Sequence, residues 1–217
     1  LDYLIDSGSI TEFGKLHNFE EIENYDDFKN QVPISNYSDL FPFIERMMNG
    51  ERDVLWPGRI NWFSKSSGTT NAKSKFIPIS HENLENCHIK GNWNTMNFFY
   101  DQREDAKQFE CRSIVMGGSL HPYKHNNETL VGDVSAIMLK NMPNFAWAFM
   151  SPGMEVCLME NFEEKIERMA QITSKQRDIV MIGGVPTWTV VLFKRILEIT
   201  GAKNMLEVWP EFQVYIH

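Results

Sequence analysis

The sequence predicts an α/β protein with mixed sheets, flanking helices and a parallel portion in its second half. Strand-like and helical segments alternate from residue 111 onward, which is typical of a parallel sheet. Earlier in the chain, two short strand-like segments flank a polar loop. The 217 residues are 42% hydrophobic and include 15 Phe and 6 Trp, so we expect a sizeable packed core.

The pattern before Pro57 is helical. The clearest segment begins with the cap-type residues Asn36 and Ser38 and stops at Gly50. Its apolar residues recur at helical spacing, at Leu40, Ile44 and Met47. Pro42 falls early enough to be tolerated in a first turn.

The next elements surround the polar loop. Ile60–Phe63 and Lys75–Ile79 are predicted to be short strands. Ser80 is expected to cap a helix that runs to about Phe99, with Gly91 weakening its middle.

The second half alternates strands and helices. Ser113–Gly118 is predicted to be a buried strand that ends in glycines. Asn161 and Glu164 have capping-box spacing before a helix with one apolar face, formed by Phe162, Ile166, Met169 and Thr173.

Residues 178–200 are predicted to form a strand, a glycine turn and a helix capped by Thr187. The core-facing residues of this helix are expected to be Phe193, Ile196 and Leu197. Residues 212–217 follow as another strand.

Composition excludes several classes of protein. A net charge of −8 argues against a broad nucleic-acid-binding face. No apolar run approaches the roughly 20 residues of a membrane span, and no signal segment opens the chain. The cysteines Cys87, Cys111 and Cys157 form no CxxC pair, so we interpret them as reduced thiols of a cytoplasmic protein.

Because the chain starts within a helical pattern and stops after a strand, we expect a fragment of a longer protein.

No metal site is predicted. His121 and His125 are four residues apart, but Pro122 and the neighbouring asparagines indicate a loop rather than a helix face. Asp133 follows a glycine, is typical of a turn and is assigned no role.

The polar loop lies in a locally basic stretch. Between Asp53 and Glu82 there is no acidic residue, whereas the basic residues are Arg59, Lys65, Lys73 and Lys75. Such a stretch could hold a small anion. Charge alone favours the simpler interpretation, four solvated surface side chains.

Residues 66–70 read SSGTT, which fits neither a Walker loop nor the GxGxxG of a dinucleotide fold. Their four hydroxyls can donate to phosphate oxygens, and Gly68 would let successive N–H groups point inward. A flanking lysine can add a charge-assisted contact. By composition alone, an ordinary polar turn is as good an interpretation.

The longer string SKSSGTTNAKSKFIPIS resembles the phosphate-binding motif of adenylate-forming enzymes, [ST]SGTTGxPK. It is most similar to the auxin-responsive acyl acid-amido synthetase branch, in which the lysine comes later. Three further segments are similar to the same branch, so the resemblance covers most of the chain. They are TEFGKLHNFEEIENYDDFKNQVPISNYSDLFPFIERMMNGERDVLWPGRINWF, LVGDVSAIML and MIGGVPTWTVVLFKRILE. The spacing departs from the general motif at Asn71, Lys73 and Ser74, which leaves open which lysine meets phosphate; the branch spacing favours Lys75.

The resemblance implies part of an acetyl-CoA-synthetase-like large domain, with residues 1–217 a fragment of the N-terminal adenylating domain. It implies that ATP and Mg²⁺ activate a carboxylic acid, whose acyl group passes to an amine or amino acid. The phosphate contacts carried over to this chain are Ser66, Ser67, Gly68, Thr69, Thr70 and Lys75, with Lys73 in reserve.

Catalytic residues and a C-terminal lid domain are expected beyond residue 217, so we expect the fragment alone to be inactive and to partner the missing C-terminal part. Two alternatives share the motif: a nucleotide-binding or interaction module without catalysis, and an acyl-CoA ligase.

A second candidate site follows a predicted strand. Gly183, Gly184, Val185 and Trp188 occupy the strand-to-helix position at which α/β sheets bind ligands, and could line the acyl pocket. A tight turn with Trp188 packed in the core is the slightly favoured alternative.

Overall fold

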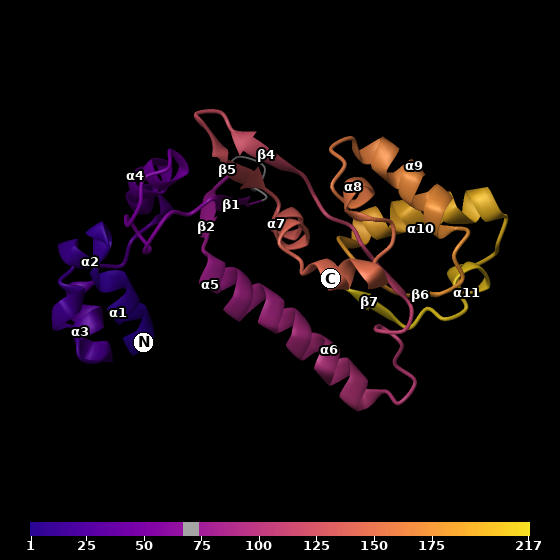
Figure 1. Cartoon of the computed structure of the whole chain (residues 1–217), viewed down its shortest axis with the longest axis horizontal. Coiled ribbons are helices and arrows are strands. Elements are labelled where there is room, and N and C mark those ends of the chain that lie inside the picture. The colour runs from indigo at the N-terminus through magenta and orange to yellow at the C-terminus, as the bar shows by residue number, and fades with distance from the viewer. Residues whose placement is uncertain (67–73) are drawn as a thin grey trace. The chain divides into compact units, whose positions relative to one another are not determined.

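The computed structural model describes residues 1–66 and 74–217 and divides into two compact units. The first unit comprises residues 1–83 and 121–132, and the second comprises residues 84–120 and 133–217. Each unit is considered by itself below (Figure 1).

The first unit begins with helices and continues into a sheet. Its helices are α1 (Asp2–Ser9), α2 (Glu12–Leu16), a 3-10 turn (Phe19–Glu21), α3 (Tyr25–Gln31), α4 (Tyr37–Met48) and the short α5 (His81–Asn83). Its strands are β1 (Trp62–Lys65), β2 (Phe76–Ile79), β4 (Leu120–Tyr123) and β5 (Asn126–Gly132).

Among the described residues, the strands of this unit pair in the order β2–β1–β5–β4. β1 runs antiparallel to β2, with Trp62 opposite Ile79, and parallel to β5, with Trp62 opposite Leu130. The two strands predicted around the polar loop are therefore confirmed, with β1 starting at Trp62 rather than Ile60.

Helix α4 confirms the predicted start and stop signals. Asn36 and Asp39 form a capping box, in which the Asn36 N–H donates to the Asp39 carboxylate over 2.7 Å. Gly50 follows the helix with a φ of 97°, a conformation that glycine adopts at little cost. The expected first-turn position of Pro42 is wrong, because α4 begins at Tyr37 and Pro42 lies inside the helix, beyond its first turn.

Tyr37 connects α4 to strand β2. Its hydroxyl accepts from the Phe76 N–H over 2.7 Å and donates to the Phe76 carbonyl over 3.3 Å. The other end of α4 packs its apolar face into a core with Phe63 of β1, which is fully buried. The helix therefore fixes where β2 starts, one residue after Lys75.

The second unit is a small parallel sheet with helices. Its helical elements are a π-helical turn (Leu84–Ile89), α6 (Lys90–Gln102), α7 (Val134–Lys140), a 3-10 turn (Asn144–Phe149), α8 (Met154–Cys157), α9 (Phe162–Thr173), α10 (Pro186–Thr200) and α11 (Met205–Val208). Its strands are β3 (Arg112–Val115), β6 (Ile179–Gly183) and β7 (Val214–Ile216).

Strand β6 lies between β3 and β7 and runs parallel to both. The core of this unit is formed by side chains of β3, β6, α8, α9, α10 and the segment around α11. Its fully buried members include Ile114, Met169, Ile179, Ile182, Leu192, Ile196 and Trp209. The predicted α/β class with a parallel portion is thus confirmed.

Of the two long helices in this core, α9 begins at the predicted cap and α10 does not. Asn161 caps α9 by accepting from the Glu164 N–H over 3.0 Å, as predicted. The predicted cap of α10 is wrong, because the N-cap is Val185 and Thr187 lies inside the helix. Pro186 decides the start, since its fixed φ suits the first helical position and its missing N–H needs no partner there.

Helix formation after Ser80 is also confirmed, with a refinement. The Ser80 hydroxyl accepts from the Asn83 N–H over 3.1 Å. The helical run then passes through the π-helical turn and continues to Gln102, three residues beyond the expected end. The sequence carried no signal that predicted the π-helical turn.

Replacing Tyr37 with Phe is expected to reduce the free energy of unfolding by about 1–2 kcal/mol, because it removes both hydrogen bonds to Phe76 and keeps the ring. Urea unfolding measures the change. Tyr3, which is 60% exposed, is the matched control, and Tyr3→Phe should leave stability unchanged. Equal effects of the two variants would contradict the assigned role of Tyr37.

Replacing Ile182 with Ala is expected to cost about 2–5 kcal/mol, because it opens a cavity in the central strand of the second unit. The loss can be measured by tryptophan fluorescence during urea unfolding, to which Trp209 of the same core contributes. Ile199 of α10 is 39% exposed, so Ile199→Ala should cost much less. A small loss for Ile182→Ala would show that the core collapses around the deletion.

Candidate functional site

The base of the polar loop brings together two residues predicted to bind phosphate. Beyond the last β1–β2 pair, the Ser66 N–H donates to the Lys75 carbonyl over 2.8 Å. The Lys75 N–H donates to the Ser66 hydroxyl oxygen over 3.0 Å. Because that hydroxyl accepts here, its own hydrogen is left to donate to a ligand.

The Lys75 side chain is held against an aromatic ring. Its ammonium lies 5.4 Å from the ring centre of Tyr37, a cation–π contact that leaves Lys75 exposed. Tyr37 therefore contacts both the backbone of β2 and the charge beside it. An exposed lysine ammonium can form a charge-assisted hydrogen bond with a phosphate.

The expected local positive charge is smaller than the sequence suggested. Arg59 forms an ion pair with Glu128 of β5, and its guanidinium donates to the Asn126 side-chain oxygen over 3.3 Å. Glu128 is far away in sequence, so this pairing was missed. Arg59 consequently contributes little free charge, and the described lysines flanking the loop are Lys65 and Lys75.

The remaining predicted phosphate-binding residues are Ser67, Gly68, Thr69, Thr70 and Lys73. All five lie outside the residues that the structure describes. Their role stays a prediction, and the described part of the loop consists of its two ends.

The second candidate site lies at the carboxyl end of β6. Gly183 is the last residue of the strand, and the Gly184 N–H donates to the Ile216 carbonyl over 3.0 Å. The Tyr215 hydroxyl donates to the Gly184 carbonyl over 2.6 Å. A Cβ at Gly184 would lie 3.0 Å from the Cβ of Met116, so glycine lets the turn pass close to the segment that follows β3.

Val185 and Trp188 differ in their surroundings. Val185 is 47% exposed at the start of α10. Trp188 packs on the core with its ring centre 5.4 Å from that of Phe162. The structure thus brings Gly183, Gly184 and Val185 together at the sheet edge, while the contacts of Trp188 favour the core interpretation.

A polar cluster near this edge was missed by the sequence analysis. Lys165 of α9 is 3% exposed, and its ammonium donates to the Gly117 carbonyl over 2.7 Å and to the Gly118 carbonyl over 3.3 Å. Asp133, which was assigned no role, accepts from the Ser119 N–H over 2.9 Å. One sequence signal was available, since Lys165 falls on the apolar face of α9 beside Ile166.

Burial alters the ionisation of this cluster. Desolvation lowers the pKa of Lys165, and the nearby Cys157 and Asp133 partly oppose that shift. Burial also raises the pKa of the Cys157 thiol to about 12. Cys157 therefore stays protonated at neutral pH, and its thiol donates to the Pro152 carbonyl.

The histidine pair lies on a hairpin, since His121 is in β4 and His125 is between β4 and β5. Among residues 1–66 and 74–217, no group of three His, Cys, Asp or Glu side chains is placed to hold a metal ion. Within the same ranges, no helix combines the length and the apolar character that crossing a bilayer requires.

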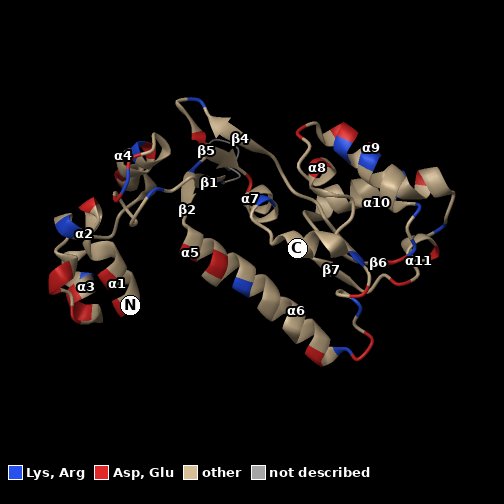
Figure 2. Ribbon diagram, in the orientation of Figure 1, with Lys and Arg blue, Asp and Glu red and all other residues tan. Residues whose placement is uncertain are grey.

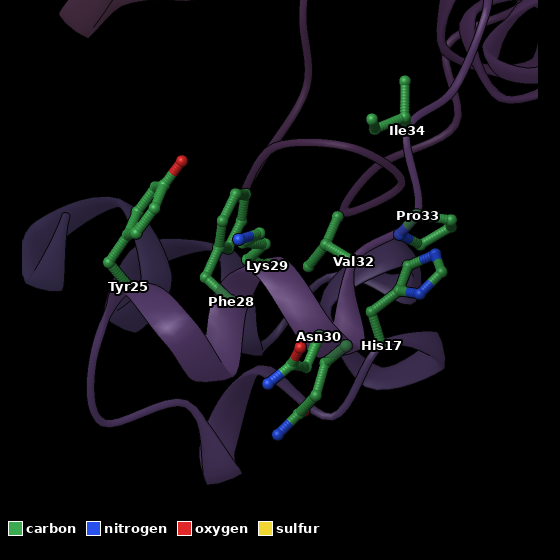
Figure 3. A pocket seen from close by; sticks show the side chains of 9 residues that line it. His17, Tyr25, Phe28, Lys29, Asn30, Val32, Pro33 and Ile34 are labelled. Atoms are coloured by element: carbon green, nitrogen blue, oxygen red, sulfur yellow. The ribbon is translucent and has the colours of Figure 1, made fainter.

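A hollow of about 670 Å³ in the first unit is lined by α3 and its flanking segments, among them His17, Tyr25, Phe28 and Ile34 (Figure 3). None of the predicted site residues lines it. Eight acidic and two basic residues fall within residues 1–31, and Figure 2 shows the ribbon of this segment coloured red at its acidic positions. The surroundings of the hollow therefore do not favour an anionic ligand.

Solved structures share this fold. A chain described as GH3.15 acyl acid amido synthetase superimposes with a TM-score of 0.73 over 91% of this chain and 35% of its own, at 19% identity. A second, AtGH3.15 acyl acid amido synthetase in complex with 2,4-DB, also gives 0.73, at 20% identity, over 91% of this chain and 34% of its own. The expected mixed α/β fold, with helices flanking the sheets, is confirmed and is shared with these acyl acid amido synthetases.

Curated relatives are similar in sequence. Jasmonoyl-L-amino acid synthetase JAR6 of Nicotiana attenuata is 34% identical over 134 residues, which are 55% of this chain and 22% of the relative. The 4-substituted benzoates-glutamate ligase GH3.12 of Arabidopsis thaliana is 34% identical over 170 residues, which are 72% of this chain and 28% of the relative. The chain thus spans less than a third of either relative. The model of the GH3 family N-terminal domain matches residues 1–217, and the chain therefore belongs to the GH3 family.

Proposed function

We propose that the full-length protein containing residues 1–217 is an ATP-dependent ligase that joins a carboxylic acid to an amine or amino acid. The observation that carries the proposal is the Ser66–Lys75 pairing at the base of an SSGTT loop, in a chain of the GH3 family. The names of the relatives support the substrate class, since they pair jasmonate or benzoates with amino acids.

The reaction has two steps. A carboxylate oxygen of the acid attacks the α-phosphorus of ATP, and pyrophosphate leaves. The amine nitrogen then attacks the acyl carbon, AMP leaves, and the nitrogen gives up a proton. The product is an amide.

The residues at the loop base suit the first step. The Lys75 ammonium and the Ser66 hydroxyl are donors that can face a polyphosphate, where negative charge grows as pyrophosphate departs. Their mutual backbone hydrogen bond and the ring of Tyr37 fix them beforehand, which limits the ordering cost on binding. The residues proposed to complete the cradle are Ser67, Gly68, Thr69 and Thr70, with Lys73 in reserve.

Mg²⁺ is expected to arrive with ATP, because this ion is held largely by substrate phosphates and water, and it would neutralise charge on those phosphates. The carboxyl end of β6, with Gly183, Gly184 and Val185, is proposed to contribute to the acid pocket. Trp188 is proposed there only as a supporting wall, since it packs on Phe162. The C-terminal part of the same protein is proposed to complete the active site.

Lys75→Ala in the full-length protein is expected to lower carboxylate-dependent ATP–pyrophosphate exchange about a hundredfold, because one donor to the leaving pyrophosphate is lost. The assay should cover jasmonate, indole-3-acetate and substituted benzoates. Lys175→Ala is the matched control, because it removes the same charge from another exposed lysine. It should exchange at the normal rate.

Two results would contradict the proposal in different ways. ATP binding without exchange for any acid would indicate a nucleotide-binding module without catalysis. Normal exchange in Lys75→Ala would remove that lysine from the site and move the assignment to Lys73. Mass spectrometry of the product with glutamate or with coenzyme A distinguishes an amide from a thioester.

A further inference from the structure

The buried ammonium of Lys165 is the starting point. It is carried on the apolar face of α9, where a charged group is costly unless it is hydrogen-bonded. Both of its hydrogen-bond acceptors are carbonyls of one turn, those of Gly117 and Gly118. An apolar side chain of similar length could fill the same space without burying a charge, so the ammonium specifically restrains that turn.

The same turn is held from its other side by helix α7. The Gly118 N–H donates to the Ser135 hydroxyl oxygen over 3.0 Å. The Ser119 N–H donates to the Asp133 carboxylate over 2.9 Å, and the Asp133 N–H donates to the Ser119 carbonyl over 3.0 Å. The peptide groups of residues 117–119 are thus restrained by two helices at once.

Steric contacts restrain the Gly117–Ser119 turn in addition to its hydrogen bonds. A Cβ at Gly118 would lie 2.1 Å from a carboxylate oxygen of Asp133, and one at Gly117 would lie 2.5 Å from a methyl group of Leu139. The turn has no room for a side chain at either position. Its backbone position is therefore defined by α7 and α9 together.

The turn follows β3 at the carboxyl edge of the parallel sheet. Next to it is the turn after β6, since the Met116 N–H donates to the Gly183 carbonyl over 2.9 Å. A ligand of an α/β sheet binds at the carboxyl ends of its strands. Because Gly183, Gly184 and Val185 at this edge are proposed to contribute to the acid pocket, the adjoining Gly117–Ser119 turn is a candidate wall of the same pocket.

We propose that Lys165 is a positioning residue that sets the affinity of the protein for its carboxylic acid by fixing the Gly117–Ser119 turn. The inference rests on the proposed ligase function. Lys165 touches no substrate in this scheme, and it acts through the backbone that forms the sheet edge. Its loss should weaken acid binding and leave the binding of ATP unchanged.

The test is Lys165→Met in the full-length protein, assayed by pyrophosphate exchange with the most active acid of the panel. Met keeps an unbranched apolar chain and removes the donors. We expect KM for the acid to rise by on the order of tenfold, because the wall of the pocket shifts, while KM for ATP stays within about twofold. Lys175→Met, just beyond α9, is the control and should change neither constant.

A second variant covers the case in which Lys165→Met fails to fold. Ser135→Ala removes the acceptor of the Gly118 N–H from the α7 side and leaves the core intact. It should raise KM for the acid in the same selective way, by a smaller factor.

Equal rises in KM for ATP and acid, or unchanged KM for acid in folded variants, would overturn the positioning role while leaving the ligase function standing. A wild-type protein without exchange for any acid would overturn the ligase function, and this inference with it.

Discussion

The parallel pairing of β3 with β6 is the interaction on which the second unit depends. It brings Ile114 and Ile182 into one buried layer, onto which α9 and α10 pack. It also aligns the carboxyl ends of the two strands, so that the turns after them run side by side. Gly184 permits that approach, since a Cβ would press on Met116. A core contact and a candidate ligand edge thus follow from the same register.

Charged side chains act differently on the surface and in the core. On the surface, Arg195 of α10 meets Glu167 of α9 at 2.6 Å, a pair that lowers the pKa of the Glu167 carboxyl through a hydrogen bond and, being half-exposed, adds little stability. The buried Lys165 differs because desolvation penalises its charge, and the carbonyl oxygens of Gly117 and Gly118 and the nearby Asp133 partly offset that penalty. A buried charge with two carbonyl acceptors restrains geometry more than it stabilises the fold.

In the first unit, a residue distant in sequence positions the strand that follows the polar loop. Tyr37, thirty-nine residues before Phe76, bonds to the first residue of β2 and also lies under the ammonium of Lys75. The hydrogen bonds between Ser66 and Lys75 then extend the hairpin by one more pair. The two ends of the predicted phosphate cradle are therefore positioned by helix α4 and by the β1–β2 hairpin.

Local sequence alone determined most of the elements, including α4 with its Asn36 cap, α9 with its Asn161 cap, the hairpin strands and the alternation that produces a parallel sheet. These features depend on neighbours along the chain, which a sequence displays directly. The motif string likewise indicated the family. Three other features emerge from the three-dimensional contacts: Arg59 is paired with Glu128, Asp133 holds a turn, and Lys165 lies inside the core. Each of these depends on a partner many residues away, and the partner of a charge is chosen by distance in space, which spacing along the chain does not encode.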